Sequence, residues 1–87
     1  MPMSELLKDE KLPIESIYVP TKRRLTLDPK KVDALAEAIL EKGQQTPILV
    51  RRDGERFVLV EGLHRLEAMK ALGETKIIGT VVQARRN

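Results

Sequence analysis

Apolar residues recur along the chain with helical spacing in one segment and in continuous runs in others. Between Asp28-Pro29, a pair typical of a helix start, and Gly43, typical of a helix end, they fall at helical intervals. These apolar positions are Val32, Leu35, Ala36, Ile39 and Leu40. The pattern predicts an amphipathic helix over residues 28–43 that buries this stripe.

Two further apolar runs predict a β-hairpin. Residues 47–50 and 57–60 flank Asp53-Gly54, which is among the strongest short-range hairpin pairs. Because residues 47–50 are apolar at consecutive positions, we expect that strand to be covered on both faces.

The remaining elements are predicted from apolar runs and from the prolines and glycines that bound or interrupt them. A first strand is expected at residues 14–19, between two prolines. A second helix is expected at residues 63–72, ended by Gly73. A last strand is expected at residues 77–82, where Gly79 indicates a bulge or a close backbone approach. The expected buried residues of the second helix are Leu66, Ala68, Met69 and Leu72.

The order strand, helix, hairpin, helix, strand predicts the fold class. We expect one compact α/β domain of the α+β kind, with a small mixed sheet and two main helices. The domain is predicted at residues 12–83, preceded by a polar arm at 1–11 and followed by a basic tail at 84–87.

Composition excludes several classes of function. The 87 residues contain no cysteine, which excludes disulfides, thiolate metal sites and cysteine nucleophiles. Two aromatic residues, Tyr18 and Phe57, are too few for a platform that stacks single-stranded bases. No apolar run is long enough to cross a membrane and no leader pattern is present, so the cytoplasm is the expected location.

Cations stand where two predicted helices begin. Lys30 and Lys31 follow the start of the first helix, and His64 and Arg65 follow Gly62 at the start of the second. Free N–H groups at a helix start already carry partial positive charge, so added cations favour an anion, above all a phosphate. We expect the two starts to converge on a phosphate, which makes Lys30, Lys31, Gly62, His64 and Arg65 candidates for phosphate binding.

Other catalytic chemistries lack their residues. One histidine and no cysteine cannot make a zinc site, and no glycine-rich phosphate loop of the Walker type is present. No serine carries a nucleophile signature, so no catalytic residue is assigned. Glu61 and Glu67 could hold Mg²⁺ through water beside a nucleotide, although surface charge is the simpler interpretation.

A second set of cations indicates a different partner. The chain carries a net charge of +3, and basic residues cluster before the first helix and near the C-terminus. They are candidates for contact with nucleic-acid phosphates. This set is Lys22, Arg23, Arg24, Arg85 and Arg86.

Three segments resemble the ParB/sulfiredoxin superfamily, in order and over most of residues 12–83. Residues 27–32 (Leu-Asp-Pro-Lys-Lys-Val) resemble the start of the first helix in sulfiredoxins. Residues 46–50 (Thr-Pro-Ile-Leu-Val) resemble a strand found in both branches. Residues 62–65 (Gly-Leu-His-Arg) match the Gly-Cys-His-Arg signature of sulfiredoxins except at one position.

The resemblance implies a nucleotide site. In sulfiredoxins the corresponding residues contact ATP phosphates, which implies this role for Lys31, His64 and Arg65. Together with Gly62 at the turn, these residues are assigned to phosphate binding. Chromosome-partitioning ParB proteins bind and hydrolyse CTP. The implied cofactor is therefore ATP or CTP with Mg²⁺.

The departures from the family pattern limit what carries over. Leu63 replaces the cysteine that sulfiredoxins need, so reduction of peroxiredoxin sulfinic acid is not expected. Ala34 and Ala38 replace the serine and threonine that help hold ATP, so affinity or base preference is expected to differ.

Three functions remain open. The first is a nucleotide-binding domain with weak phosphohydrolase activity. The second is a DNA-associated accessory or regulatory protein, with weak nuclease activity as a variant. The third is a non-catalytic scaffold that binds a protein partner. The sequence does not choose the nucleotide or the oligomeric state, and it gives no sign of a membrane partner.

Overall fold

The computed structural model of this chain describes residues 8–82. A five-stranded mixed sheet has the order β1-β5-β3-β4-β2, which confirms the predicted fold class. The elements are β1 (Asp9–Pro13), the 3₁₀ helix η2 (Ile14–Ser16), β2 (Ile17–Tyr18), α1 (Thr21–Arg24), α2 (Pro29–Lys42), β3 (Ile48–Asp53), β4 (Arg56–Glu61), α3 (Leu63–Ala71) and β5 (Lys76–Val81).

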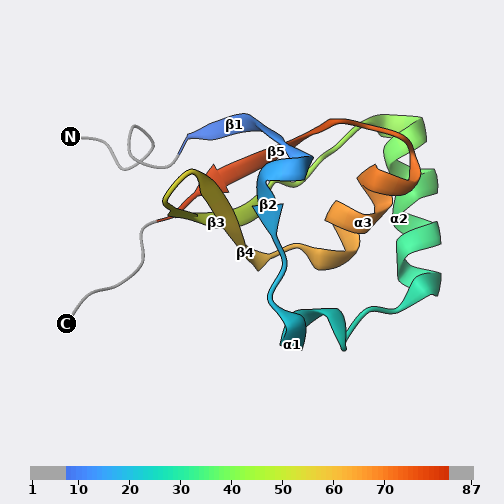
Figure 1. The fold of residues 1–87 in the computed structure, drawn as a ribbon. Coiled ribbons are helices and arrows are strands. Elements are labelled where there is room, and N and C mark those ends of the chain that lie inside the picture. The colour runs from blue at the N-terminus through green and yellow to red at the C-terminus, as the bar shows by residue number, and fades with distance from the viewer. Residues whose placement is uncertain (1–7, 83–87) are drawn as a thin grey trace.

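The elements form layers, with the sheet on one side and the two long helices on the other (Figure 1). α3 contacts β3 and β5, and α2 packs mainly on α3. β1 runs antiparallel to β5 and β3 antiparallel to β4, whereas β3 pairs in parallel with β5 and β2 with β4. No helix within residues 8–82 is both long and apolar enough to span a bilayer.

The core lies between the sheet and α3. α3 contributes Leu63, Leu66, Ala68 and Met69, all of them buried. Leu63 is absent from the predicted buried set, whereas Leu72, which belongs to it, is only half-buried at the helix end. The largest fully buried side chains are Ile48, Val50, Leu59, Leu66 and Ile77.

α2 is less buried than its apolar stripe predicts. Its end residues match the prediction, because Asp28 caps the helix and Gly43 follows it. Within α2, all of which the structure describes, no residue is fully buried. Leu40 is 76% exposed, so its assignment to the buried stripe is wrong. The physical reason is that α2 packs mainly on α3 and not on the sheet. A single helix covers only part of the apolar side of α2.

The N-terminal region differs from the prediction. Residues 9–11, assigned to the arm, form most of β1. The strand expected at residues 14–19 is divided into η2 and the two-residue β2. At the far end of β1, Asp9 lies opposite Thr80 of β5 and accepts a hydrogen bond of 2.8 Å from its hydroxyl. The predicted tail at 84–87 lies outside the described residues.

The hairpin forms as predicted, and its two strands have one register shift near the start of β3. Gly54 takes a positive φ of 63° in the turn between β3 and β4. The irregularity lies between Leu49 and Val50 of β3, whereas β5 runs regularly through Gly79. Gly79 instead allows close approach of two side chains, because a Cβ there would lie 2.7 Å from Leu12 Cδ1 and 3.2 Å from Ile48 Cγ1.

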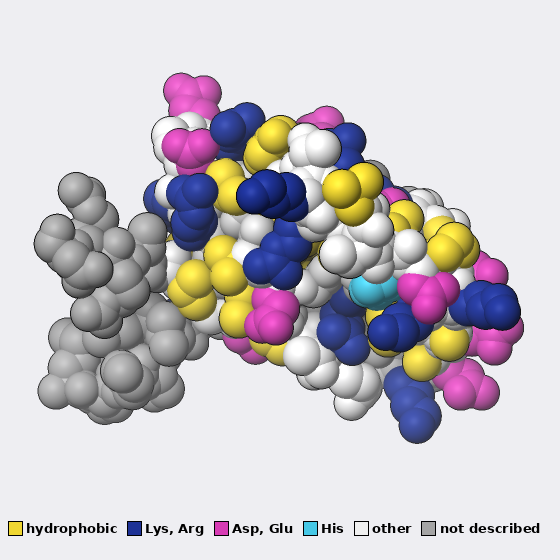
Figure 2. Space-filling view, turned by 90° about the horizontal axis from the view of Figure 1, so that it is seen from below, with side chains coloured by type: hydrophobic (Ala, Val, Ile, Leu, Met, Phe, Trp, Pro, Cys, Tyr) yellow, Lys and Arg dark blue, Asp and Glu magenta, His cyan; other side chains and the backbone are white. Residues whose placement is uncertain are grey.

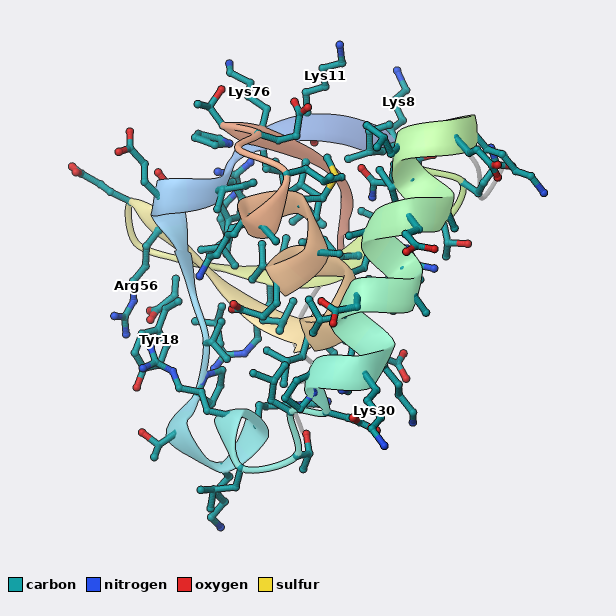
Figure 3. All side chains as sticks on the ribbon, turned by 90° about the vertical axis from the view of Figure 1, so that its right-hand side faces the viewer. Lys8, Lys11, Tyr18, Lys30, Arg56 and Lys76 are labelled. Atoms are coloured by element: carbon teal, nitrogen blue, oxygen red, sulfur yellow. The ribbon has the colours of Figure 1, made fainter. Side chains whose placement is uncertain are left out.

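A cation and an aromatic ring connect the hairpin to the short edge strand. The guanidinium of Arg56 lies 4.4 Å from the centre of the Tyr18 ring and is paired at 3.1 Å with Asp53. Figure 3 shows Arg56 and Tyr18 side by side at the edge of the sheet. Since β2 has only two paired residues, this contact supplements its hydrogen bonding.

The side-chain amide of Gln44 extends the sheet beyond the start of β3. Its Oε1 accepts the backbone N–H of Ile78 at 2.7 Å, and its Nε2 donates to the carbonyl of Ile78 at 2.8 Å. The same Nε2 donates to the carbonyl of Thr46 at 2.9 Å. The half-buried side chain of Gln44 thus satisfies both the N–H and the carbonyl of Ile78, just before the pairing of β3 with β5 begins.

Replacement of Gln44 by alanine is expected to lower the free energy of unfolding by about 1–3 kcal/mol, because partly buried backbone groups lose their partners. Urea unfolding measures the change. Gln45→Ala is the matched control: its amide donates only to the exposed carbonyl of Lys42, so we expect a loss within about 0.5 kcal/mol. Equal losses in the two variants would contradict the role given to Gln44.

Candidate functional site

The starts of α2 and α3 lie together. The carboxylate of Asp28 caps α2 by accepting the backbone N–H of Lys30 at 3.0 Å. The backbone N–H of Asp28 in turn donates to Nε2 of His64, in the first turn of α3, at 2.9 Å. A direct hydrogen bond therefore joins the two helix starts that the sequence led us to expect side by side.

A cavity of about 380 Å³ opens where these helix starts meet. Its volume is in the range of small-molecule sites. All four residues assigned to phosphate binding line it: Lys31, Gly62, His64 and Arg65. Lys30, the neighbouring cation, is not in the lining, and Figure 3 shows it projecting outward from the first turn of α2.

The cavity also contains residues that sequence reasoning placed elsewhere or missed. Arg23, assigned to the nucleic-acid set, lines it from α1, and Thr26 lines it from the turn that follows. The hydroxyl of Thr26 donates to the carbonyl of Arg23 at 2.7 Å, which ties this turn to the helix. The remaining lining residues are Leu35, Glu61 and Leu63.

The charge of the cavity favours an anion. Three of the cavity's described lining residues are basic, namely Arg23, Lys31 and Arg65, and Glu61 is the one acidic residue in the lining. The first turn of α3 holds no acidic residue, and its N-cap makes no side-chain hydrogen bond. The α3 N–H groups therefore add partial positive charge. Figure 2 shows the chain's histidine, in cyan, on this face with Lys and Arg side chains near it and an acidic side chain beside it.

Gly62 shapes the turn between β4 and α3. Its φ of 115° is a backbone angle that residues with a Cβ rarely adopt. A Cβ on Gly62 would lie 2.5 Å from Cγ2 of Ile48, a residue with no exposed surface. The glycine thus lets the turn approach the core closely, and it sets the position of His64 and Arg65.

Leu63 and the two alanines of α2 bear on the departures noted in the sequence. Leu63 is 6% exposed and belongs to the core cluster, so its side chain anchors the turn while it also borders the cavity. Ala34 and Ala38 line a separate hollow on the outer side of α2, together with Leu40. They are not among the residues of the cavity described above.

The two carboxylates considered for Mg²⁺ have different positions. Glu61 lines the cavity, whereas Glu67 lies in another groove and is paired with Lys70 at 3.3 Å. The described residues contain no group of three or more side chains of the kind that could hold a metal by themselves.

Three members of the second cationic set lie in the described part of the chain, all of them exposed on α1. Arg23 lines the cavity, and Lys22 and Arg24 are exposed on the single turn of α1. Arg85 and Arg86 lie outside the described residues.

Comparison with known proteins places the chain in a family. The ParB N-terminal domain family matches residues 3–87. The chromosome-partitioning protein ParB of Myxococcus xanthus is 41% identical over 64 residues, which are 72% of this chain and 22% of that protein. The chain spans less than a quarter of the length of the curated relatives it matches first, with shares of 24% and 22%.

Two solved structures share the fold. Sulfiredoxin from Arabidopsis thaliana is 31% identical, with a TM-score of 0.80 over 88% of this chain and 86% of the other. The C-terminally truncated ParB from Caulobacter crescentus, in complex with CTP-γ-S, is 25% identical, with a TM-score of 0.73 over 92% of this chain and 46% of the other. Because the family matches nearly the whole chain and both folds agree, the chain belongs to the ParB N-terminal domain family, within the ParB/sulfiredoxin superfamily.

Proposed function

We propose that this domain binds the phosphates of a nucleoside triphosphate, ATP or CTP, in the cavity between α1, α2 and α3. The observation that carries the proposal is the convergence of Arg23, Lys31 and Arg65 with the start of α3 on one cavity. The complex of the Caulobacter crescentus relative with CTP-γ-S supports it, because that protein has the same fold and binds a nucleotide.

The charges suit a polyphosphate better than a single anion. The three cations come from three different elements, so they can approach phosphate oxygens from several sides. Contacts from arginine to phosphate are charge-assisted and about twice as strong as neutral hydrogen bonds. Mg²⁺ would be held by the nucleotide's own oxygens, by water and by Glu61.

Slow phosphohydrolase activity is the second part of the proposal. Arg23, Lys31 and Arg65 would stabilise charge that develops on the phosphoryl oxygens. His64 is poorly placed as a general base, because Nε2 already accepts the N–H of Asp28. We therefore expect slow turnover, measured as phosphate release that disappears in Arg65→Ala. Release that persists in that variant would point to a contaminating enzyme.

Calorimetric titration with ATP, CTP and ADP, with and without Mg²⁺, tests the binding directly. We expect a dissociation constant of millimolar or better for one triphosphate and weaker binding of the diphosphate, because the latter offers fewer oxygens to the cations. If none of the three nucleotides binds at millimolar concentration, the proposal fails.

A further inference from the structure

The backbone N–H of Asp28, the N-cap residue of α2, has no acceptor of the capping-box kind within α2. In a capping box, the residue at the third helical position is Glu or Gln, and its side chain accepts the backbone N–H of the N-cap residue. In α2 the N-cap is Asp28 and the third helical position is Lys31. A lysine side chain has only donors, so it cannot accept this bond.

His64 supplies the missing acceptor from another helix. Its Nε2 lies 2.9 Å from the backbone nitrogen of Asp28, and 36 positions separate the two residues in the chain. The bond is partly buried, which raises the cost of leaving the N–H without a partner. A nitrogen that accepts carries no proton, so the ring is neutral in this arrangement and Nδ1 carries its hydrogen.

We propose that His64 is a positioning residue that completes the N-cap of α2 and so allows a cation to occupy its third helical position. The consequence for binding rests on the proposed function above: Lys31 would face the phosphates because His64 performs the task that Glu or Gln performs in a capping box. In this role His64 would add no positive charge to the cavity and would affect a ligand only through the position of Lys31, unlike the cationic role first expected for it.

Two substitutions of His64 distinguish the role of Nε2 from the role of Nδ1. The glutamine side chain is long enough to place its amide oxygen near the position of Nε2, whereas the asparagine amide reaches only the neighbourhood of Nδ1. If His64 acts through Nε2, His64→Gln keeps the melting temperature and triphosphate affinity close to the parent, within about threefold in affinity. His64→Asn loses at least several degrees in melting temperature and about tenfold in affinity.

The melting temperature without nucleotide tests the positioning role independently of ligand binding. If the asparagine variant melts below the glutamine variant but neither the parent nor the variants bind a nucleotide, the proposed function fails and the role of His64 stands. If the two variants melt alike, or the asparagine variant melts higher, the positioning role is overturned whatever the titrations show. Better nucleotide binding by the asparagine variant would also overturn it, because Nδ1 would then be the important atom.

A change at Lys31 provides the matched second test. Lys31→Gln restores an acceptor at the third helical position, so Asp28 N–H no longer depends on His64. In that background, His64→Asn should lower the melting temperature by less than half of its effect in the parent chain. An undiminished effect would show that the two side chains do not share this donor, and it would overturn the proposal.

Discussion

Replacement of Gly62 by alanine is expected to lower the free energy of unfolding by about 2–5 kcal/mol. The added Cβ would require a rarely allowed φ of 115° and would collide with Cγ2 of Ile48 at 2.5 Å. Since Ile48 has no exposed surface, it has little room to move. For a domain of this size the loss corresponds to a fall of roughly 10 °C or more in melting temperature, measured by calorimetry or circular dichroism.

Gly73→Ala is the matched control for this experiment. Gly73 has a φ of 79°, but no heavy atom lies within 4 Å of the position that an added Cβ would take, so its replacement adds backbone strain without a collision. We expect a loss of about 1–2 kcal/mol from that strain. If Gly62→Ala costs no more than Gly73→Ala, the close approach to Ile48 does not constrain the turn.

Arg65→Ala is expected to weaken triphosphate binding by about 10- to 100-fold. Hydrogen bonds to charged groups contribute about 1.5–3 kcal/mol, and each 1.4 kcal/mol is a factor of ten in affinity. Arg65 is half-buried in the cavity lining, so salt screens its contacts less than those of a surface cation. Isothermal titration calorimetry with the better-bound triphosphate measures the loss, and thermal melting verifies that the variant is folded.

Two further variants separate local contact from overall charge. Arg51, an exposed residue of β3, is not part of the cavity lining, so Arg51→Ala should change affinity less than about twofold. Arg65→Lys keeps the charge but loses the planar fork, so its affinity should lie between those of the parent and Arg65→Ala. Equal losses in Arg51→Ala and Arg65→Ala would mean that nucleotides respond to the net charge of the domain and not to this cavity.

The sequence predicted the elements whose signals are local. The caps of α2 and the Asp-Gly turn of the hairpin follow from neighbouring residues, and the structure confirms both. β1 was missed because only one of its five residues, Leu12, is fully buried, and four are charged or proline. An edge strand of this kind has almost no alternation to detect, and its existence depends on pairing with β5.

Only part of the lining of the candidate cavity could be predicted from the sequence, for a similar reason. Cations at two helix starts are visible in the sequence, and the structure does place Lys31 and Arg65 on one cavity. The segment that forms α1 has no periodic pattern in the sequence. The sequence therefore does not predict that Arg23 and Thr26 line this cavity. The run of cations just before the Leu-Asp-Pro helix start was the available hint. The bond between His64 and Asp28 depends on tertiary contact and has no sequence signature.

The pairing of β1 with β5 brings the two ends of the described segment together. The residues at its outer end, Asp9 and Thr80, come from opposite ends of the chain yet are neighbours in the sheet. A unit whose entry and exit points are adjacent can be inserted into a surface loop of a host protein without forcing the flanking backbone apart. The cavity is built from α1, α2 and the turn between β4 and α3, so such a graft would leave it intact.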